Sequence, residues 1–104
     1  MLAVVKPQDV AENSPVERGA LFLDARYPKW AQKVDPETIN VAHAALCPLG
    51  QLYGTSESGC RTLGIDNYRD FLLQHGFAAT PIGGYMKNVA AMNAGWRLEI
   101  ERRH

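Results

Sequence analysis

The sharpest chemical candidate in the sequence is a cysteine, Cys47, in the stretch LCPLGQLYG. Pro48 is typical of the first turn of a helix, so Cys47 is expected at a helix N-terminus, where the macrodipole and free N–H groups stabilise a thiolate. His43 lies four residues earlier and would be the base that a cysteine nucleophile needs. Cysteine is also among the residue types most often buried, where it packs as a small hydrophobe. We favour this structural role and keep a Cys47-dependent thiol enzyme as an alternative.

A metal site could use His43, Cys47, Cys60 and His75, whose side chains are of types that zinc accepts. Their spacings match no compact zinc motif, and Pro48 keeps the first two off a common helical face. The sequence also lacks the GxxxxGK[ST], GxSxG and HExxH motifs. We therefore predict no catalytic residue, no metal and no cofactor, in a protein that is not an enzyme.

The elements that would position these residues are all predicted to be helices. SPVE at Ser14–Glu17 is a capping box, and the helix that it opens carries one apolar stripe before Pro28 ends it: Val16, Ala20, Leu23 and Tyr27. Pro48 excludes a helix running through it from Val41, so a short helix is expected from Pro48 to Tyr53, with Gly54 as its stop. Within it, Gln51 and Tyr53 need hydrogen-bond partners if they are buried.

Further helix signals follow along the chain. Helix starts are predicted at Asp35-Pro36 and at Thr80-Pro81, each an acceptor side chain followed by proline. Two more helices are expected to end at Gly64 and Gly76, where a large apolar residue follows a glycine. Asp66 is expected to cap the second of them, whose inner stripe would be Tyr68, Phe71, Leu72 and His75.

The last helix, from Tyr85 onward, has the clearest pattern in the chain. Its apolar seam is Tyr85, Val89, Met92, Trp96 and Ile100. Glu99 and Arg103 form a favourable i,i+4 pair. The seam either closes the core of the monomer or pairs with a second copy as a short coil. The fold class predicted is all-α: a compact single domain, residues 1–104, of about five short helices plus a longer C-terminal helix.

Charge and composition restrict the partners. The 104 residues carry 11 basic and 11 acidic side chains, so broad electrostatic capture of nucleic acid or of an anionic membrane is not expected. The N-terminus does not resemble a signal peptide, and no stretch approaches the ~20 apolar residues of a membrane span. Two cysteines do not make a disulfide framework. We expect a cytoplasmic protein.

The segment from Leu21 to Phe77 carries the pattern LDARYPKWAQKVD, followed by CPLGQLYG, LGI and HGF. Its most specific elements are Asp24-x-Arg26-x-Pro28-x-Trp30, Val34-Asp35 and Cys47-x-Leu49-Gly50-Gln51-Leu52-Tyr53-Gly54. In these elements the chain resembles a group of small uncharacterised helical proteins of actinobacteria and their phages. The resemblance implies a source and a small helical fold, and it implies no mechanism and no functional residue.

Two surfaces are predicted to bind a partner. The first combines cations and an aromatic side chain, which together could stack on bases or hold an acidic tail: Arg26, Lys29, Trp30 and Lys33. The second is the outer face of the last helix: Asn93, Arg97 and Glu101. For the first surface there is an alternative, in which Tyr27 and Trp30 fold inward while Asp24 pairs with Arg26.

The sequence therefore predicts a small non-enzymatic protein-binding module, an accessory factor of phage or genomic-island origin that modulates a host protein, as a monomer or a homodimer. A nucleic-acid-binding or transcription-associated regulator is an alternative, since residues 56–76 read as two helices joined by a glycine turn. The second of these helices sets Asp66 and Asp70 against Arg69, whereas phosphate contacts need excess positive charge. This alternative needs a basic patch made in three dimensions by Arg61, Arg69, Lys87 and Arg97.

Overall fold

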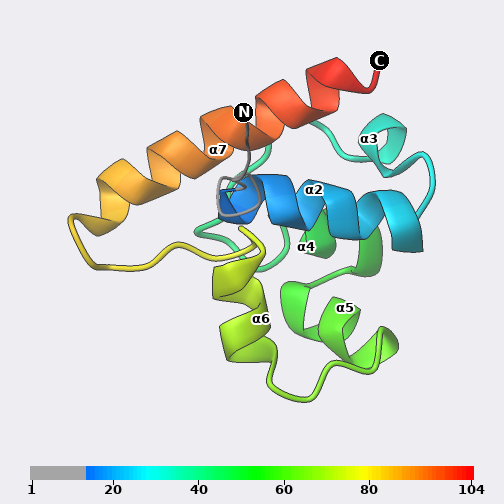
Figure 1. Cartoon of the computed structure of the whole chain (residues 1–104), viewed down its shortest axis with the longest axis horizontal. Helices are drawn as coiled ribbons and strands as arrows, with labels where there is room; N and C mark the ends of the chain where they lie inside the picture. The colour runs from blue at the N-terminus through cyan, green and yellow to red at the C-terminus, as the bar shows by residue number, and fades with distance from the viewer. Residues whose placement is uncertain (1–13) are drawn as a thin grey trace, which may run out of the picture.

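The structure, a computed structural model, describes residues 14–104 and is all-α over that range (Figure 1). The helices are α2 (Pro15–Arg26), α3 (Trp30–Lys33), α4 (Pro48–Tyr53), α5 (Ser56–Thr62), α6 (Tyr68–Gln74) and α7 (Tyr85–Arg102). The predicted fold class, several short helices and a longer C-terminal one, is confirmed.

The longest helix, α7, runs along one side of the molecule, and α2 packs beneath it (Figure 1). Val16 lies against Gly95 at one end of this pair, and Asp24 binds Arg103 at the other, so the two helices run in the same direction. Helices α4, α5 and α6 lie on the side of α2 opposite to α7 in Figure 1. The short helix α3 follows α2 in the chain and packs against both α4 and α7. Helix α7 therefore has one side in the core and one side turned away from the other helices.

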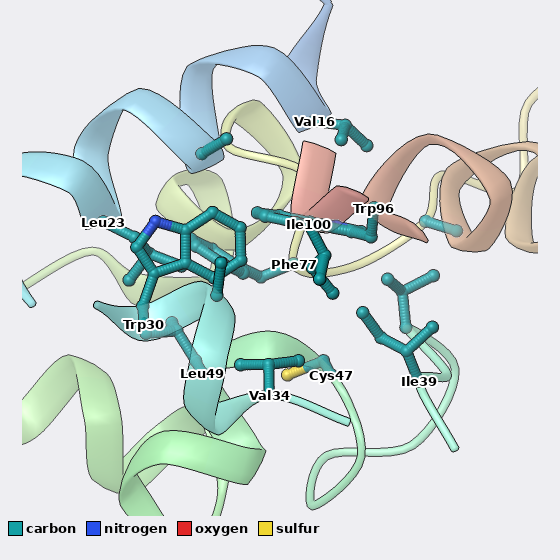
Figure 2. Packing of buried hydrophobic residues seen from close by; sticks show 14 of the residues in the cluster. Val16, Leu23, Trp30, Val34, Ile39, Cys47, Leu49, Phe77, Trp96 and Ile100 are labelled. Atoms are coloured by element: carbon teal, nitrogen blue, oxygen red, sulfur yellow. The ribbon is translucent and has the colours of Figure 1, made fainter. Parts of the chain in front are cut away.

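The core is built around large aromatic side chains, several of which Figure 2 shows. Trp30 and Trp96 meet edge to face with ring centroids 5.6 Å apart, and Phe77 stacks on Trp96 at 5.3 Å. Phe71 follows at 6.0 Å from Phe77, and Phe22 at 4.9 Å from Phe71. We call these five rings the aromatic column. It joins side chains from α2, α3, α6, α7 and the segment after α6, so segments far apart in sequence share one packing unit.

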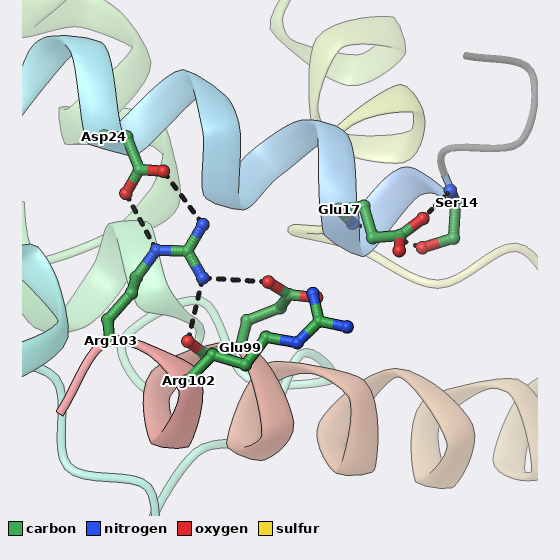
Figure 3. Close-up of polar contacts among 6 residues, drawn as sticks. All are labelled: Ser14, Glu17, Asp24, Glu99, Arg102 and Arg103. Atoms are coloured by element: carbon green, nitrogen blue, oxygen red, sulfur yellow. Dashed lines mark hydrogen bonds and ion pairs between the residues drawn. The ribbon is translucent and has the colours of Figure 1, made fainter. Parts of the chain in front are cut away.

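Helix α2 begins and ends where its sequence signals predict. Ser14 and Glu17 form both bonds of the capping box: the Ser14 hydroxyl accepts from the Glu17 N–H at 3.2 Å, and the Ser14 N–H donates to the Glu17 carboxylate at 2.8 Å (Figure 3). The helix ends at Arg26, ahead of Pro28. Of its apolar stripe, three residues are buried and Tyr27 is half-buried.

Helix α4 has the predicted bounds at both ends, and Gln51 within it has hydrogen-bond partners. The Gln51 amide donates to the carbonyl oxygens of Leu46 (3.0 Å) and Asp35 (3.3 Å), and its own oxygen accepts from the Asp35 N–H at 2.7 Å. The Tyr53 ring packs edge to face against Tyr27 at 5.7 Å. Gln51 therefore fixes the loop before α4 against the helix itself.

Three predicted helix starts are wrong. At Asp35-Pro36 the chain forms only a turn, in which the Asp35 carboxylate accepts from the Glu37 N–H, because the Gln51 side chain occupies both backbone groups of Asp35. Helix α6 is capped by Asn67 and not by Asp66. At Thr80-Pro81 the chain again forms a turn, and α7 begins only at Tyr85.

The apolar stripes of the last two helices are confirmed except at their first residues. In α6, Phe71 and Leu72 pack on the core, whereas Tyr68 is exposed. In α7, Val89, Trp96 and Ile100 are buried, and Tyr85 is exposed. The seam of α7 therefore closes the core of the monomer, and the alternative in which this seam pairs with a second copy is wrong.

Candidate functional site

Cys47 is the N-cap of α4, as predicted, but its environment opposes thiolate chemistry. Its side chain is 1% exposed, and the sulfur accepts a hydrogen bond from the Gly50 N–H at 3.3 Å. Burial raises the pKa of the Cys47 thiol, outweighing the backbone N–H groups of Gly50 and Leu49 that lower it. His43 is exposed, and its Nδ1 accepts from the Ala45 N–H at 3.2 Å. The exposed, base-assisted thiol that the enzyme alternative requires is not formed.

The described residues hold no group suited to a metal ion: nowhere between residues 14 and 104 do three or more His, Cys, Asp or Glu side chains gather. Cys60 is buried, and burial raises the pKa of its thiol. No helix in the same range has the length and hydropathy to cross a bilayer.

Trp30, predicted as part of a partner-binding surface, is instead a core residue at 1% exposure. Its indole Nε1 donates to the Asp24 carboxylate at 2.9 Å, and the Arg103 guanidinium lies 5.4 Å from the centroid of its ring. The reason for the inward orientation is the neighbouring Trp96, which provides an edge-to-face contact and a fully buried surface. Trp30 is therefore excluded from any surface site.

The three cations predicted beside Trp30 are separated from it. Arg26 is exposed, with its guanidinium 5.1 Å from the centroid of the Phe22 ring. Lys29 has φ of 69° and stands exposed in the turn before α3, and Lys33 is exposed at the end of that helix. Without Trp30, these three exposed cations do not form the platform of cations and tryptophan that the sequence predicts.

Asp24 pairs with Arg103 (Figure 3). The alternative prediction that it pairs with Arg26 is therefore wrong. Both carboxylate oxygens of Asp24 accept from the Arg103 guanidinium at 2.8 Å, which holds the pKa of the Asp24 carboxyl below its usual range. The same guanidinium donates to the Glu99 carboxylate at 2.8 Å, so the predicted Glu99–Arg103 pair is confirmed. Glu99 is buried and also meets Arg102 at 3.3 Å. This cluster joins the ends of α2 and α7 and is structural.

Of the three residues predicted as a binding surface on α7, two make structural contacts and one is exposed. The Asn93 side chain accepts from the Val41 N–H at 2.9 Å, and the Arg97 guanidinium donates to the Pro36 carbonyl at 2.9 Å. These two residues hold the segment between α3 and α4 against α7. Glu101 is exposed, and no described residue forms an ion pair or side-chain hydrogen bond with it.

Leu98, which is 52% exposed, stands on α7 between two shallow hollows. One, of about 490 Å³, lies toward the C-terminus and is lined by Pro36, Ala94, Arg97, Leu98, Ile100, Glu101 and His104. The other, of about 390 Å³, lies toward the start of α2, where Pro15, Val16, Met92 and Gly95 contribute to its wall. Arg97 and Glu101 of the predicted set thus border a concave surface.

The most exposed large apolar side chains lie at the other end of α7, where the sequence analysis placed no site. Ile82 is 82% and Met86 72% exposed, and Tyr85 between them is also exposed. The Asn88 amide donates to the carbonyls of Thr80 (2.8 Å) and Ile82 (2.9 Å), which fixes the turn that carries Ile82. We call Ile82, Tyr85 and Met86 the α7 tip. A signal was present in the stretch PIGGYM, where apolar residues surround two glycines, although helical periodicity assigned only Tyr85 a role.

The same turn shows what the glycine pair does. Gly83 and Gly84 have φ of 85° and 116°, and a Cβ at either position would meet no close neighbour. Their role is the backbone conformation and not tight packing. The turn therefore projects Ile82 away from the core by geometry that side-chain-bearing residues rarely adopt.

The basic patch that a nucleic-acid regulator would need is not assembled. Its four predicted members lie on three helices: Arg61 on α5, Arg69 on α6, and Lys87 and Arg97 on α7. Figure 1 shows α5 and α7 at opposite sides of the molecule, Arg61 faces Glu57 at 3.9 Å, and Arg97 is held by Pro36.

Comparison of the chain with models of protein families, with curated protein sequences and with solved structures gives no match.

Proposed function

We propose that the protein is a non-enzymatic protein-binding module that engages its partner through the α7 tip. The observation that carries the proposal is the exposure of Ile82, on a turn that Asn88 fixes by hydrogen bonds, and of Met86, in the first turn of α7. A backbone that is already fixed loses little conformational entropy on binding, and the buried core of a protein interface is enriched in apolar area, with Met among the enriched residue types.

The chemistry of the partner follows from the tip. Ile82 and Met86 fit an apolar pocket, and Met adapts its shape to irregular walls. The exposed Tyr85, which carries a hydroxyl, lies between them in sequence and suits the polar rim of such a pocket. The resemblance to small proteins of actinobacteria and their phages supports a host protein in the cytoplasm as that partner, modulated by an accessory factor of phage or genomic-island origin.

The test is a capture experiment with matched variants. The tagged full chain is incubated with actinobacterial lysate, with and without nuclease, and bound proteins are identified by mass spectrometry. The variants are Ile82→Ser and Met86→Ser, and the control is Leu21→Ser on α2, which removes an apolar side chain 54% exposed elsewhere on the surface. The affinity of any purified partner is then measured by calorimetry.

The proposal requires a nuclease-resistant partner whose affinity falls at least about tenfold in each tip variant and is unchanged in the control, since burying one such side chain contributes about 1.5–3 kcal/mol. A partner that all three variants bind equally well would refute the tip as the site. Capture that nuclease abolishes would favour the nucleic-acid alternative instead.

A further inference from the structure

The side of α7 that faces away from the core has a symmetric arrangement of residues. Successive helical residues differ by about 100° around the axis, so Lys87 and Glu101 lie about 20° to either side of Ala94. Ala90 and Leu98 lie about 40° to either side of it by the same rule. All five residues are exposed, while the buried Val89, Trp96 and Ile100 lie on the opposite side of the helix. Ala94 is therefore the centre of the exposed face.

We propose that this face pairs with the same face of a second copy of the chain, as two antiparallel α7 helices related by a two-fold axis beside Ala94. In such a pair, a residue a given number of positions after Ala94 meets the residue the same number before it in the partner. Glu101 then meets Lys87 of the second copy, and the symmetry repeats this ion pair at the other end. Leu98 meets Ala90, a large side chain against a small one.

Charge and shape both favour this partner over others. Neither Lys87 nor Glu101 forms an ion pair with any described residue, so both charges are available. The small side chains at and beside the centre allow two helix axes to approach to about 8–10 Å. The two hollows beside Leu98 give room for the edges of the second helix. Helix α7, at 18 residues, offers about 27 Å of contact length.

The surface so covered is separate from the α7 tip, and the inference does not rest on the proposed function. Ile82 precedes the helix, and Tyr85 and Met86 lie about 180° and about 80° around the axis from Ala94, outside the face centred on it. A dimer would therefore present two tips, one at each end of the paired helices. The two proposals fail separately, because Glu101→Lys leaves the tip intact and Ile82→Ser leaves the face intact.

The first test exchanges charges. Sedimentation velocity on the full chain is expected to show a monomer–dimer equilibrium with a Kd on the order of 10–100 µM, as suits a small interface. Lys87→Glu and Glu101→Lys each replace two attractive pairs by two repulsive ones, so each raises the Kd by about tenfold. An equimolar mixture of the two variants restores complementarity and forms a heterodimer with affinity near that of the wild type. Glu57→Lys on α5 is the control and leaves the Kd unchanged.

The second test uses the two-fold axis. Antiparallel helices about 10 Å apart place facing Cα atoms about 5–6 Å from each other, within reach of a disulfide. Ala94→Cys should therefore give a covalent dimer under mild oxidation, whereas Glu57→Cys on α5 should not. Cys47 and Cys60 are buried and do not compete.

Four results would overturn the proposal. In the first test, these are a wild type that stays monomeric at about 500 µM, about tenfold above the middle of the expected Kd range, charge variants whose self-association equals that of the wild type, and a mixture of the two variants that does not recover dimerisation. In the second test, it is cross-linking of Ala94→Cys that is no faster than that of Glu57→Cys. Any of these leaves the face to another occupant.

Discussion

The same substitution, glycine to alanine, should have opposite effects at two sites in the helices. Gly19 lies within α2 and Gly95 within α7. Helix propensity alone favours alanine at both positions by about 0.8–1 kcal/mol. At Gly95 the added Cβ would lie 3.4 Å from a methyl group of Val16, an ordinary van der Waals contact. Gly95→Ala is therefore expected to stabilise the protein by about 0.5–1 kcal/mol.

At Gly19 the surroundings make the same substitution destabilising. A Cβ there would lie 2.0 Å from the carbonyl oxygen of His75 and 2.9 Å from the Trp96 ring, the first more than an ångström inside normal contact. The carbonyl belongs to the backbone and cannot rotate away as a side chain would. Overpacking costs about 1–3 kcal/mol, and loss of the neighbouring bond from Trp96 to the Gly76 carbonyl adds about 1–3 kcal/mol. After the propensity gain, the destabilisation by Gly19→Ala lies between about 1 and about 5 kcal/mol, and we expect about 3 kcal/mol.

Thermal and urea unfolding measure both effects. For a domain of this size, 1 kcal/mol corresponds to about 4–8 °C in Tm. Gly95→Ala should raise the Tm by several degrees, and Gly19→Ala should lower it by about 10–25 °C. Fluorescence is a suitable probe because both tryptophans are buried. A Gly19→Ala variant as stable as the wild type, or more stable, would refute the close approach of α2 to the end of α6 and to Trp96.

Three further predictions concern single groups. Cys47 should react with Ellman's reagent roughly a hundredfold or more slowly in the native chain than in urea, because the raised pKa and the burial both oppose the thiolate; equal rates would contradict its burial. Asp24→Asn should lower the free energy of unfolding by about 1 kcal/mol at pH 7, where the carboxylate pairs with Arg103. Because the pairing lowers the folded-state pKa, this contribution is complete above the unfolded pKa of about 4 and is lost as the pH falls through the lower folded-state pKa. Urea unfolding between about pH 5 and about pH 2 should therefore show the difference between variant and wild type shrinking, and a difference that does not change with pH would contradict the pairing. Trp96→Phe should lower the free energy of unfolding by about 2–4 kcal/mol in the same assay, because it opens a cavity and leaves the Gly76 carbonyl, which accepts from Trp96 at 2.6 Å, without its donor. A loss below about 0.5 kcal/mol, which is within the range of ordinary surface substitutions, would contradict this hydrogen bond.

The parts of the fold that the sequence predicts are those governed by neighbouring residues. The capping box at Ser14, the bounds of α4 between Pro48 and Gly54, and the pair between Glu99 and Arg103 all depend on residues within about two helical turns of each other. Interactions over this range are the same in most folds, so residue type and spacing suffice to identify them.

What the sequence does not predict depends on residues far apart in the chain. The Asp35-Pro36 signal is a valid local start, but Gln51, 16 positions later, binds the backbone of Asp35 in a turn. Trp30 turns inward because Trp96 packs against it, and Asp24 binds Arg103 at a separation of 79 residues. The predicted binding surfaces were the least accurate part, because contacts between distant residues decide which side chains are exposed. None of the three residues of the α7 tip was expected at the surface.

The aromatic column has a consequence for how the protein unfolds. Each of α2, α3, α6 and α7 contributes a ring that contacts the ring of another segment, so detaching any one of these helices exposes an aromatic face on its neighbour. These four helices should therefore form one cooperative unit, whose slowest amides exchange hydrogen only when the whole unit opens. Helices α4 and α5 add no ring to the column and pack on each other, and their amides should exchange through a smaller, earlier opening. The column thus divides the described helices into a late-opening unit and a more labile α4–α5 pair, although both belong to the same small fold.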